Sequence, residues 1–477
     1  RFVDARPQYG KCPQRITVLE HTTKESHMQG SRRRALALTG TGVAAIVLLS
    51  GCLQNPNASG GGAGGGEGGA DNSEVDGDKV VTILGAFGGA EAELFNSSLV
   101  AFEEETGIDV QYTSDQDFTN TIRIRTESNQ QPDIAIFPQP GGLLEQASKG
   151  SIQAIDSYLD YDALDETLVP GFMDASRLNG RVYGAPIRLA VKSIVWYPKA
   201  AYEAGGYNTA PANLTELADV ATEIREGGTA PWCMGWGSDQ ATGWVGTDWI
   251  EEYMLRLHGP DVYDDWTSHK IPFNDPRVVE AFDAYGELIG IDGNVLGGTS
   301  GIISTPFGEA MLPAFQDPPQ CLMERQGNFV TGFFPDAVQD NLDDEVGIFV
   351  FPRIEGGYEG QPILGGGDLA ALMNGNDPDA IEVMKFITSP EFGGEWAAGG
   401  GWLSPHTTFD ATLYPDDITR ATAEIVANAD VFRYDGSDLM PNAVGGGSFW
   451  TGMVDWVTGA KTAQQVTTEI EESWPAS

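Results

Sequence analysis

The sequence predicts an α/β protein whose first part is a parallel sheet with helices between its strands. Short apolar runs at 80–84, 108–112 and 133–137 have the length and composition of buried strands. The segments between them repeat apolar residues at helical spacing. Strands that alternate with helices form parallel sheets with right-handed crossovers, and such sheets bind ligands at the carboxyl ends of their strands.

The helices of this first part are expected at 91–106, 117–128 and 141–149. The first has Leu94, Phe95, Leu99 and Phe102 on one face and ends at Gly107. The strand ends lead into residues 85–90 and 138–140, where the sequence predicts ligand contacts.

The second part is also predicted to be α/β. An extended segment, 183–197, is longer than one typical strand and is expected to pass from one domain into another. The helix at 276–289 has Asp275 as its cap and Pro276 as its first residue. The other expected elements are helices at 214–226 and 378–388, a helix beginning at Ser389-Pro390 with Phe392 and Trp396 inward, and strands at 349–352 and 369–373.

An export signal precedes these domains. Residues 31–34 are Ser-Arg-Arg-Arg, residues 35–50 are a short, almost uncharged apolar run, and 49–52 read Leu-Ser-Gly-Cys. The run is shorter than the roughly 20 residues of a membrane span, and its end resembles a lipobox, which predicts lipid on Cys52. An uncut anchor helix is the alternative, and the arginines fit either a Sec or a twin-arginine route. We therefore expect a non-mature segment at 1–27, a signal peptide at 28–51 and a Gly-rich flexible linker at 52–78.

The charge of the chain excludes nucleic acid as a partner. The 477 residues carry a net charge of −42, and the part after residue 51, with 19 basic and 66 acidic residues, carries −47. Such a surface repels phosphate backbones and anionic lipids. Solubility outside the cell or a salt-rich habitat accounts for the acidity.

Two of the four cysteines are left for the exported domain. Cys12 precedes the signal and Cys52 is the lipidation site, so Cys233 and Cys321 are expected to pair in an oxidising compartment. The alternative is two free buried thiols.

The sequence contains no catalytic signature that we accept. It has no G-x-S-x-G elbow and no G-x-x-x-x-G-K-S/T loop. His258, His269 and His406 are not spaced as metal ligands, so we expect neither a metal nor another cofactor.

Tryptophan beside polar residues and glycine is the most informative feature. Residues 232–249 include four tryptophans. Two others, Trp402 and Trp450, follow glycine and phenylalanine, respectively. An indole plane packs against the apolar face of a sugar, while carboxylate, amide and guanidinium groups bind its hydroxyls. Core packing is the competing explanation for each single tryptophan.

Several stretches in their order along the chain resemble the extracellular solute-binding proteins of carbohydrate ABC importers, the maltose-binding-protein-like family. These are the lipobox at Cys52, Pro132-Asp-Ile-Ala, Tyr183-Gly-Ala-Pro186 leading to Trp196-Tyr197, Ser389-Pro-Glu-Phe392, and 439–450. The stretches 231–235, 242–249 and 435–441 resemble the α-glucoside branch. The resemblance covers essentially all of 79–477.

This resemblance implies a two-lobed periplasmic-binding-protein-like fold (type II), with each lobe a mixed sheet flanked by helices. Lobe I would comprise 79–187 plus 368–412, and lobe II 188–367 plus 413–477. The lobes would close on a sugar in the cleft between them, as a hinge motion in which the ligand selects the closed state.

The resemblance also implies a set of ligand contacts. Trp450 matches the stacking tryptophan, and Gln139 follows the third strand where the family has a polar contact. The other implied residues are Glu91, Asp239, Trp244, Asp248 and Asp368. Trp402 is a further candidate because it is a tryptophan that follows glycine. Arg188 near the hinge would bind a hydroxyl or a carboxylate; the alternative for Arg188 and Lys192 is a salt bridge to a nearby acid.

The sequence thus predicts a lipid-anchored, monomeric binding protein on the extracellular face of the cytoplasmic membrane. It would present an α-glucoside-like sugar to ABC permease subunits and would not be an enzyme. Three alternatives are a binding protein for a charged glucoside such as a glucosylated acid, a secreted glycoside hydrolase, whose clefts also combine tryptophan with acids, and a cell-surface adhesion or sensor module.

Overall fold

The computed structural model describes residues 78–475, which lie within one compact unit, Ser73–Ser477. The predicted signal peptide, the lipidation site at Cys52 and all but the last residue of the linker lie outside the described residues. Within 78–475, no helix is both long and apolar enough to cross a membrane.

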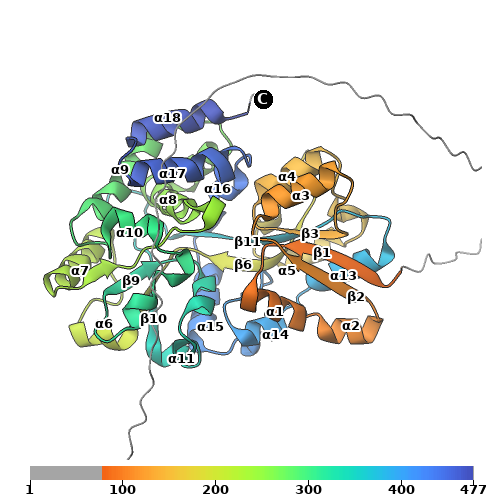
Figure 1. Ribbon diagram of the computed structural model, residues 1–477, viewed down its shortest axis with the longest axis horizontal. Coiled ribbons are helices and arrows are strands. Elements are labelled where there is room, and N and C mark those ends of the chain that lie inside the picture. The colour runs from red at the N-terminus through yellow and green to blue at the C-terminus, as the bar shows by residue number, and fades with distance from the viewer. Residues whose placement is uncertain (1–77, 476–477) are drawn as a thin grey trace, which may run out of the picture. The chain divides into compact units, whose positions relative to one another are not determined.

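The first lobe is built on a parallel sheet of three neighbouring strands, as the sequence predicts (Figure 1). β1 (Val80–Gly85) lies between β2 (Asp109–Ser114) and β3 (Ile134–Phe137) and runs parallel to both. These strands are rich in buried valine and isoleucine, and β3 is buried along its whole length. The three carboxyl ends therefore meet at one edge of the sheet.

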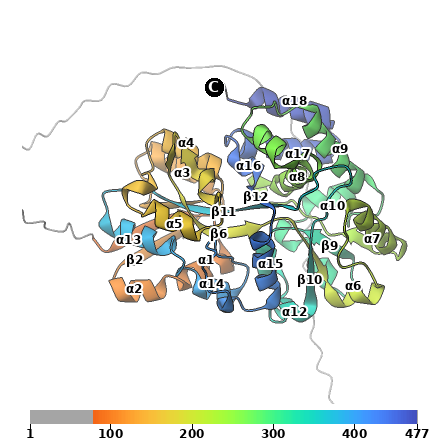
Figure 2. The same ribbon diagram turned by 180° about the vertical axis from the view of Figure 1, so that it is seen from behind.

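Helices cover both faces of this sheet (Figures 1 and 2). They are α1 (Gly89–Ser97), α2 (Val100–Thr106), α3 (Phe118–Glu127), α4 (Pro140–Ser148), α5 (Tyr161–Thr167), α13 (Pro378–Ile387) and α14 (Gly394–Gly399). The single helix expected at 91–106 is wrong, because the chain breaks at Ser98 into α1 and α2. The Ser98 hydroxyl donates back to the carbonyl of Leu94 (3.1 Å) and accepts the backbone N–H of Trp396 (3.1 Å), and such bonds compete with a continuous helix.

Two long strands connect the first lobe to the second. The extended segment expected at 183–197 is divided into β6 (Ala185–Val191) and β7 (Ile194–Pro198), which belong to different sheets. β11 (Pro362–Leu372) runs antiparallel to β6; at one end it pairs with β3, and at the other with β12 (Val431–Tyr434). The β6–β11 ladder has a bulge between Asp368 and Leu369.

The second lobe contains a four-stranded mixed sheet in the order β10-β7-β9-β8. Its strands besides β7 are β10 (Val346–Val350), β9 (Cys321–Arg325) and β8 (Ala230–Trp232). β8 runs parallel to β9, and the other pairs are antiparallel. A disulfide joins Cys233, directly after β8, to Cys321 at the start of β9, with the two Cα atoms 5.3 Å apart.

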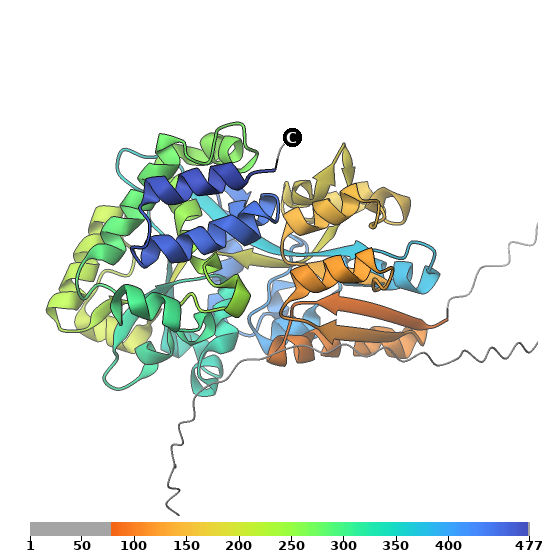
Figure 3. The same ribbon diagram turned by 45° about the horizontal axis from the view of Figure 1, so that its top comes forward.

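Most of the helices follow in this lobe and beside the crossing strands (Figures 1 and 3). They are α6 (Lys199–Gly205), α7 (Leu214–Glu226), α8 (Trp244–Thr267), α9 (Pro276–Gly290), α10 (Gly298–Ser304), α11 (Asp336–Gln339), α12 (Leu342–Glu345), α15 (Asp417–Ala427), α16 (Gly436–Leu439), α17 (Trp450–Val457) and α18 (Ala463–Ser473). Asp275 caps α9 by accepting the backbone N–H of Arg277, as expected.

Shorter elements complete the fold. They are β4 (Arg177–Leu178) paired with β5 (Arg181–Val182), the 3-10 turns η1 (Ile155–Ser157), η2 (Phe172–Ser176), η3 (Asp239–Ala241), η4 (Phe307–Glu309), η5 (Leu312–Phe315), η6 (Asn328–Phe333) and η7 (Ala411–Leu413), and the π-helical turn η8 (Val444–Phe449). η8 continues directly into α17 and so fixes the position of Trp450.

Candidate functional site

Polar side chains gather where the parallel strands of the first lobe end. Glu91 lies in the first turn of α1 after β1, Gln116 follows β2, and Gln139 follows β3 as the residue before α4. The Gln116 amide donates to the carbonyl of Ala86 (3.0 Å) and so joins the loops after β1 and β2. This edge is the one at which a parallel sheet binds its ligands.

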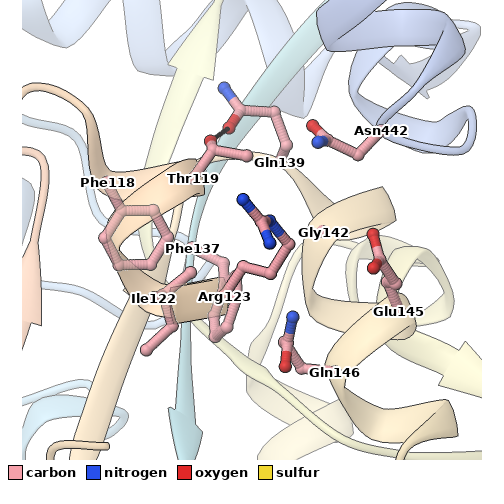
Figure 4. A pocket seen from close by; sticks show the side chains of 10 residues that line it. All are labelled: Phe118, Thr119, Ile122, Arg123, Phe137, Gln139, Gly142, Glu145, Gln146 and Asn442. Atoms are coloured by element: carbon pink, nitrogen blue, oxygen red, sulfur yellow. Dashed lines mark hydrogen bonds between the residues drawn. The ribbon is translucent and has the colours of Figure 1, made fainter. Parts of the chain in front are cut away.

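A small cavity of about 20 Å³, with apolar and polar walls, lies between α3 and α4 (Figure 4). Its apolar wall includes Phe118 and Phe137, whose rings meet edge to face at 5.1 Å. The other lining residues are Thr119, Ile122, Arg123, Gln139, Gly142, Glu145, Gln146 and Asn442. Asn442 comes from the segment between α16 and η8, far along the chain from the others. An apolar wall rimmed by amides, a hydroxyl and a guanidinium suits a polyhydroxylated ligand.

Gln146 and Gln139 are the amides best placed to contribute to this cavity. Gln146 is 3% exposed, and its Oε1 has no hydrogen-bond partner among the described residues. Gln139 accepts only a long hydrogen bond, from the Thr119 hydroxyl (3.4 Å). Polar groups with unused hydrogen-bonding capacity in a cavity favour a polar occupant.

An ion triad joins the first lobe to both crossing strands. Arg188 on β6 donates from Nη1 to Glu91 Oε1 (2.7 Å) and from Nε to Asp368 Oδ2 on β11 (2.6 Å). The Arg188 guanidinium carbon also lies 4.8 Å from the ring centre of Phe87 and 5.7 Å from that of Trp396. Burial lowers the pKa of Arg188, but the two carboxylates outweigh it, so the pKa is raised and the guanidinium stays charged.

A second ion cluster lies on the second-lobe side. The Lys192 ammonium, directly after β6, donates to Asp248 Oδ1 on α8 (3.0 Å) and to Asp435 Oδ2 after β12 (2.5 Å). All three side chains are buried. Burial raises the pKa of Asp248 to about 8, whereas Lys192 overcomes burial at Asp435 and holds the pKa of that carboxyl below its ordinary value. The pair therefore holds one proton near neutral pH, on the Asp248 side.

This cluster has the spacing of a cation site but already contains a cation. Asp248, Glu251 and Asp435 offer carboxylate oxygens within 4.8 Å of one another. The Lys192 ammonium contacts two of them, and Glu251 spends both of its oxygens on the backbone N–H groups of Gly436 and Ser437 (2.9 Å each). The cluster therefore stabilises the junction of β6, α8 and α16 without requiring a metal.

Trp450 is the tryptophan with a free ring. Of the eleven tryptophans, all within residues 78–475, ten contact another aromatic ring. No ring contact joins Trp450 to a described residue, and its Nε1 is buried there without a hydrogen-bond partner. A β-carbon on Gly446 would lie 3.6 Å from the Trp450 ring and 2.9 Å from Asn442 Oδ1, so Trp450 adjoins the residue that lines the cavity.

Asp239 lies in η3, shortly before α8, and Trp244 lies at the start of α8. Trp244 begins α8, donates from Nε1 to the Ser238 hydroxyl (2.9 Å), and lies against Phe307 at 5.3 Å. The Lys192 ammonium lies 5.3 Å from the Trp244 ring centre, so less of this ring is free than in Trp450. Asp239 is exposed, with a positive φ of 49°.

Trp402, expected among the ligand contacts, is instead a core residue. It is 1% exposed, donates from Nε1 to the Ile187 carbonyl (3.2 Å), and packs against the rings of Phe392, Trp396 and Phe409. Three aromatic neighbours and a backbone carbonyl therefore hold the ring and the polar atom of this indole within the lobe. Core packing, the competing explanation in the sequence, applies to this tryptophan.

The structure adds residues that the sequence did not single out. Asn442, Gln146 and Asp435 enter the site through contacts with residues far away in the chain. The only local signal for two of them was that Asp435 and Asn442 fall within the stretches 435–441 and 439–450, which resemble a known family.

Comparisons with known proteins agree with this arrangement. Residues 86–393 match the family model described as bacterial extracellular solute-binding protein. The osmoprotective compounds-binding protein GgtB of Synechocystis sp. is 43% identical over 404 residues, covering 84% of this chain and 94% of that protein. The alpha-glucosides-binding periplasmic protein AglE of Rhizobium meliloti is 35% identical over 403 residues, covering 83% and 87%.

Solved structures share the fold at low sequence identity. The bacterial solute receptor AcbH, described with an exclusive preference for β-D-galactopyranose, superposes with a TM-score of 0.70 at 19% identity. The alignment covers 82% of this chain and 97% of the receptor. At this identity the likeness concerns the two-lobed architecture.

Proposed function

Because the chain belongs to the bacterial extracellular solute-binding protein family, and so is a substrate-binding component of an ABC importer and not an enzyme, we propose that it captures a small neutral α-glucoside between its lobes. The site would combine stacking on Trp450 with hydrogen bonds from the amides of the α3–α4 cavity. The ligand would leave chemically unchanged.

The free ring of Trp450 is the observation that carries this proposal. The Nε1 of Trp450 lacks a hydrogen-bond partner among the described residues, but so do those of the core residues Trp232, Trp236 and Trp266. Trp450 differs from them because its ring contacts no other aromatic ring of residues 78–475. A pyranose supplies the missing ring contact, since its apolar C–H face packs against an indole. The adjoining Asn442, Gln139 and Gln146 would bind further hydroxyls.

The charge of the site supports a neutral ligand. Arg188 is paired with two carboxylates. Lys192 is paired with the Asp435 carboxylate and also contacts the Asp248 carboxyl, so neither side chain offers an uncompensated positive charge. A glucosylated acid would meet Glu91 and Asp368 beside Arg188 and would be repelled. These contacts disfavour the charged-glucoside alternative, and the relatives, all binding proteins, disfavour the hydrolase and the adhesion or sensor module.

The names of the relatives support the ligand class. One relative binds α-glucosides and another binds osmoprotective compounds. A neutral α-glucoside that accumulates as a compatible solute, such as trehalose or sucrose, belongs to both descriptions. We therefore rank such compounds above long oligosaccharides.

The setting in the cell is part of the proposal. Lipid on Cys52 and the Gly-rich leash would hold a monomeric protein near its permease, to which it would deliver the sugar. Residues 79–187 with 368–412 would move as one lobe and 188–367 with 413–477 as the other.

Titration calorimetry on purified residues 73–477 tests the proposed function. We expect micromolar or tighter binding of at least one of trehalose, sucrose, maltose and glucosylglycerol, with no release of glucose. Binding of none of these would overturn the proposal, and a thermal shift on a charged glucoside would then favour the charged-glucoside alternative.

A further inference from the structure

We propose that Glu91 sets the charge of the ligand that the site accepts, by neutralising Arg188. This inference rests on the proposed function and names the residue that would make the site selective for neutral glucosides. In this view Arg188 is an anion-binding group that the protein has masked with a carboxylate of its own.

The guanidinium is held in place independently of Glu91. Its Nε donates to the buried Asp368, and the rings of Phe87 and Trp396 lie against it at 4.8 and 5.7 Å. Asp368 is 2% exposed and sits at the bulge of the β6–β11 ladder. Three contacts therefore keep Arg188 in position when the fourth, to Glu91, is removed.

Glu91 is the accessible member of the triad. The Glu91 side chain is 34% exposed, against 3% for Asp368, and Glu91 lies in the first turn of α1 at the edge where the parallel strands end. It occupies Nη1 of Arg188, and no described residue hydrogen-bonds to Nη2. Two neighbouring N–H groups at the end of a guanidinium are the fork that binds a carboxylate side-on. The Glu91 carboxylate thus occupies the place that an anionic ligand would need.

A series of neighbouring residues links the triad to Trp450. Asp368 and Lys192 are close enough for their charges to interact, Lys192 lies over the ring of Trp244, and Gly243 contacts the backbone of Trp450. This run of contacts passes from the first-lobe edge to the tryptophan that would stack the sugar. In this proposal a substituent of the bound glucoside lies on the exposed side of Glu91, next to Arg188.

Removing the charge of Glu91 should reverse the preference. Glu91→Gln keeps the size of the side chain but removes the negative charge beside Arg188. A neutral amide binds the guanidinium more weakly than a carboxylate does, so a ligand carboxylate displaces it more readily. Hydrogen bonds between charged groups and the loss of repulsion together predict a roughly 10- to 100-fold rise in affinity for an anionic glucoside relative to its neutral counterpart.

The experiment uses a matched pair of ligands and a matched pair of variants. Glucosylglycerol and glucosylglycerate share the glucosyl group and a three-carbon aglycone, and the second carries a carboxylate. Glu93→Gln removes the same charge from the same helix, and Glu93 is exposed and forms no salt bridge with a described residue. Calorimetry at pH 7.5 gives the affinity ratio for wild type, Glu91→Gln, Glu93→Gln and the double variant Glu91→Gln/Arg188→Met, with melting temperatures as a check on folding.

We expect the ratio to shift toward glucosylglycerate in Glu91→Gln only, and to return in the double variant. An unchanged ratio in Glu91→Gln, an equal shift in Glu93→Gln, or a shift that survives the loss of Arg188 would each overturn the inference. If Glu91→Gln does not fold, the same affinity ratio is measured for Glu91→Ala. If the wild type binds neutral glucosides and Glu91→Gln has the same affinity ratio as the wild type, this inference alone is refuted. If the wild type binds no neutral glucoside, the proposed function is refuted, and the inference with it.

Discussion

The α-carbon of Gly141 lies so close to Met440 that a β-carbon on the glycine would come within 2.1 Å of the Met440 carbonyl oxygen. Gly141 is in the first turn of α4 in the first lobe, and Met440 follows α16 in the second. The two lobes therefore meet here backbone to backbone, beside the cavity lined by Asn442.

Gly141→Ala should weaken sugar binding by hindering this approach of the lobes. Overpacking at a tight contact costs roughly 1–3 kcal/mol, which corresponds to about a 5- to 150-fold loss of affinity if the cost applies to the ligand-bound arrangement alone. Calorimetry with the best neutral glucoside measures the loss. Gly290→Ala is the control, because a β-carbon at Gly290 meets nothing within 4 Å; equal affinities for both variants would contradict the prediction.

Trp450→Ala should reduce affinity for a neutral glucoside by at least about 30-fold, the effect of truncating a well-placed aromatic anchor of about 2 kcal/mol. Trp450→Phe keeps a ring but loses the N–H, so an intermediate loss is expected. Ligand titration followed by intrinsic fluorescence provides the measurement.

Trp474→Ala is the matched control for this tryptophan. Trp474 stacks on His269 at 4.0 Å near the end of the described chain, away from the cavity residues. Its removal should leave the affinity within about twofold of wild type. A similar loss in both variants would indicate a general effect on folding.

The raised pKa of Asp248 predicts that the free energy of unfolding falls as the pH rises. Burial raises its pKa from 3.8 to about 8, so the folded state holds a proton that the unfolded chain releases near pH 4. The stability that depends on this proton is complete below about pH 4 and is lost as the pH rises through about 8. Urea unfolding between pH 5 and 9 should show this decline, although other groups contribute to the profile.

Asp248→Asn isolates the contribution of this proton, because the amide resembles the neutral carboxyl and does not titrate. We expect the variant to show a flatter profile and to be no less stable than wild type at pH 9. Glu251 and Asp438, whose pKa values burial also raises, leave part of the slope in place. A parallel decline in variant and wild type would show that Asp248 is not the titrating group.

The disulfide should contribute strongly to folding. Cys233 and Cys321 are separated by 88 positions, and closing a loop of that size stabilises the folded state by about 4–5 kcal/mol in the chain-entropy model. A reducing agent should therefore lower the melting temperature of wild type. It should not affect Cys233→Ser/Cys321→Ser, which should melt at the reduced value; equal melting with and without reductant in wild type would contradict this.

The sequence predicted the ends of those helices and strands that depend on neighbouring residues in the chain. The cap at Asp275 and the proline after it place the start of α9, and the apolar run before Phe137 places β3 within one residue. The break at Ser98 was missed because it depends on Trp396, almost 300 positions away. The helix α8 was not expected, because its tryptophans suggested a binding loop.

The candidate site was predictable only in part, for the same reason. Trp450 emerged from its polar and glycine-rich surroundings, but equally suggestive surroundings at Trp402 belong to a core residue. The partners of Lys192 lie 56 and 243 positions away, and sequence spacing cannot identify which of many acids will neutralise it. Contacts of this kind are decided by topology.

The bulge in the β6–β11 ladder has a mechanical consequence. Gly367 has a φ of 155°, and a β-carbon there would lie 1.9 Å from the Arg188 carbonyl, so no side chain fits at this point of the crossing. Gly367 is the last of three consecutive glycines in β11, and glycine weakens the interior of a strand, so we expect rotation of one lobe against the other to concentrate there. The next residue, Asp368, holds the guanidinium of Arg188, so any twist of the ladder would move the triad directly. The rotation of the lobes and the selection of ligands by charge would then both depend on Gly367 and Asp368.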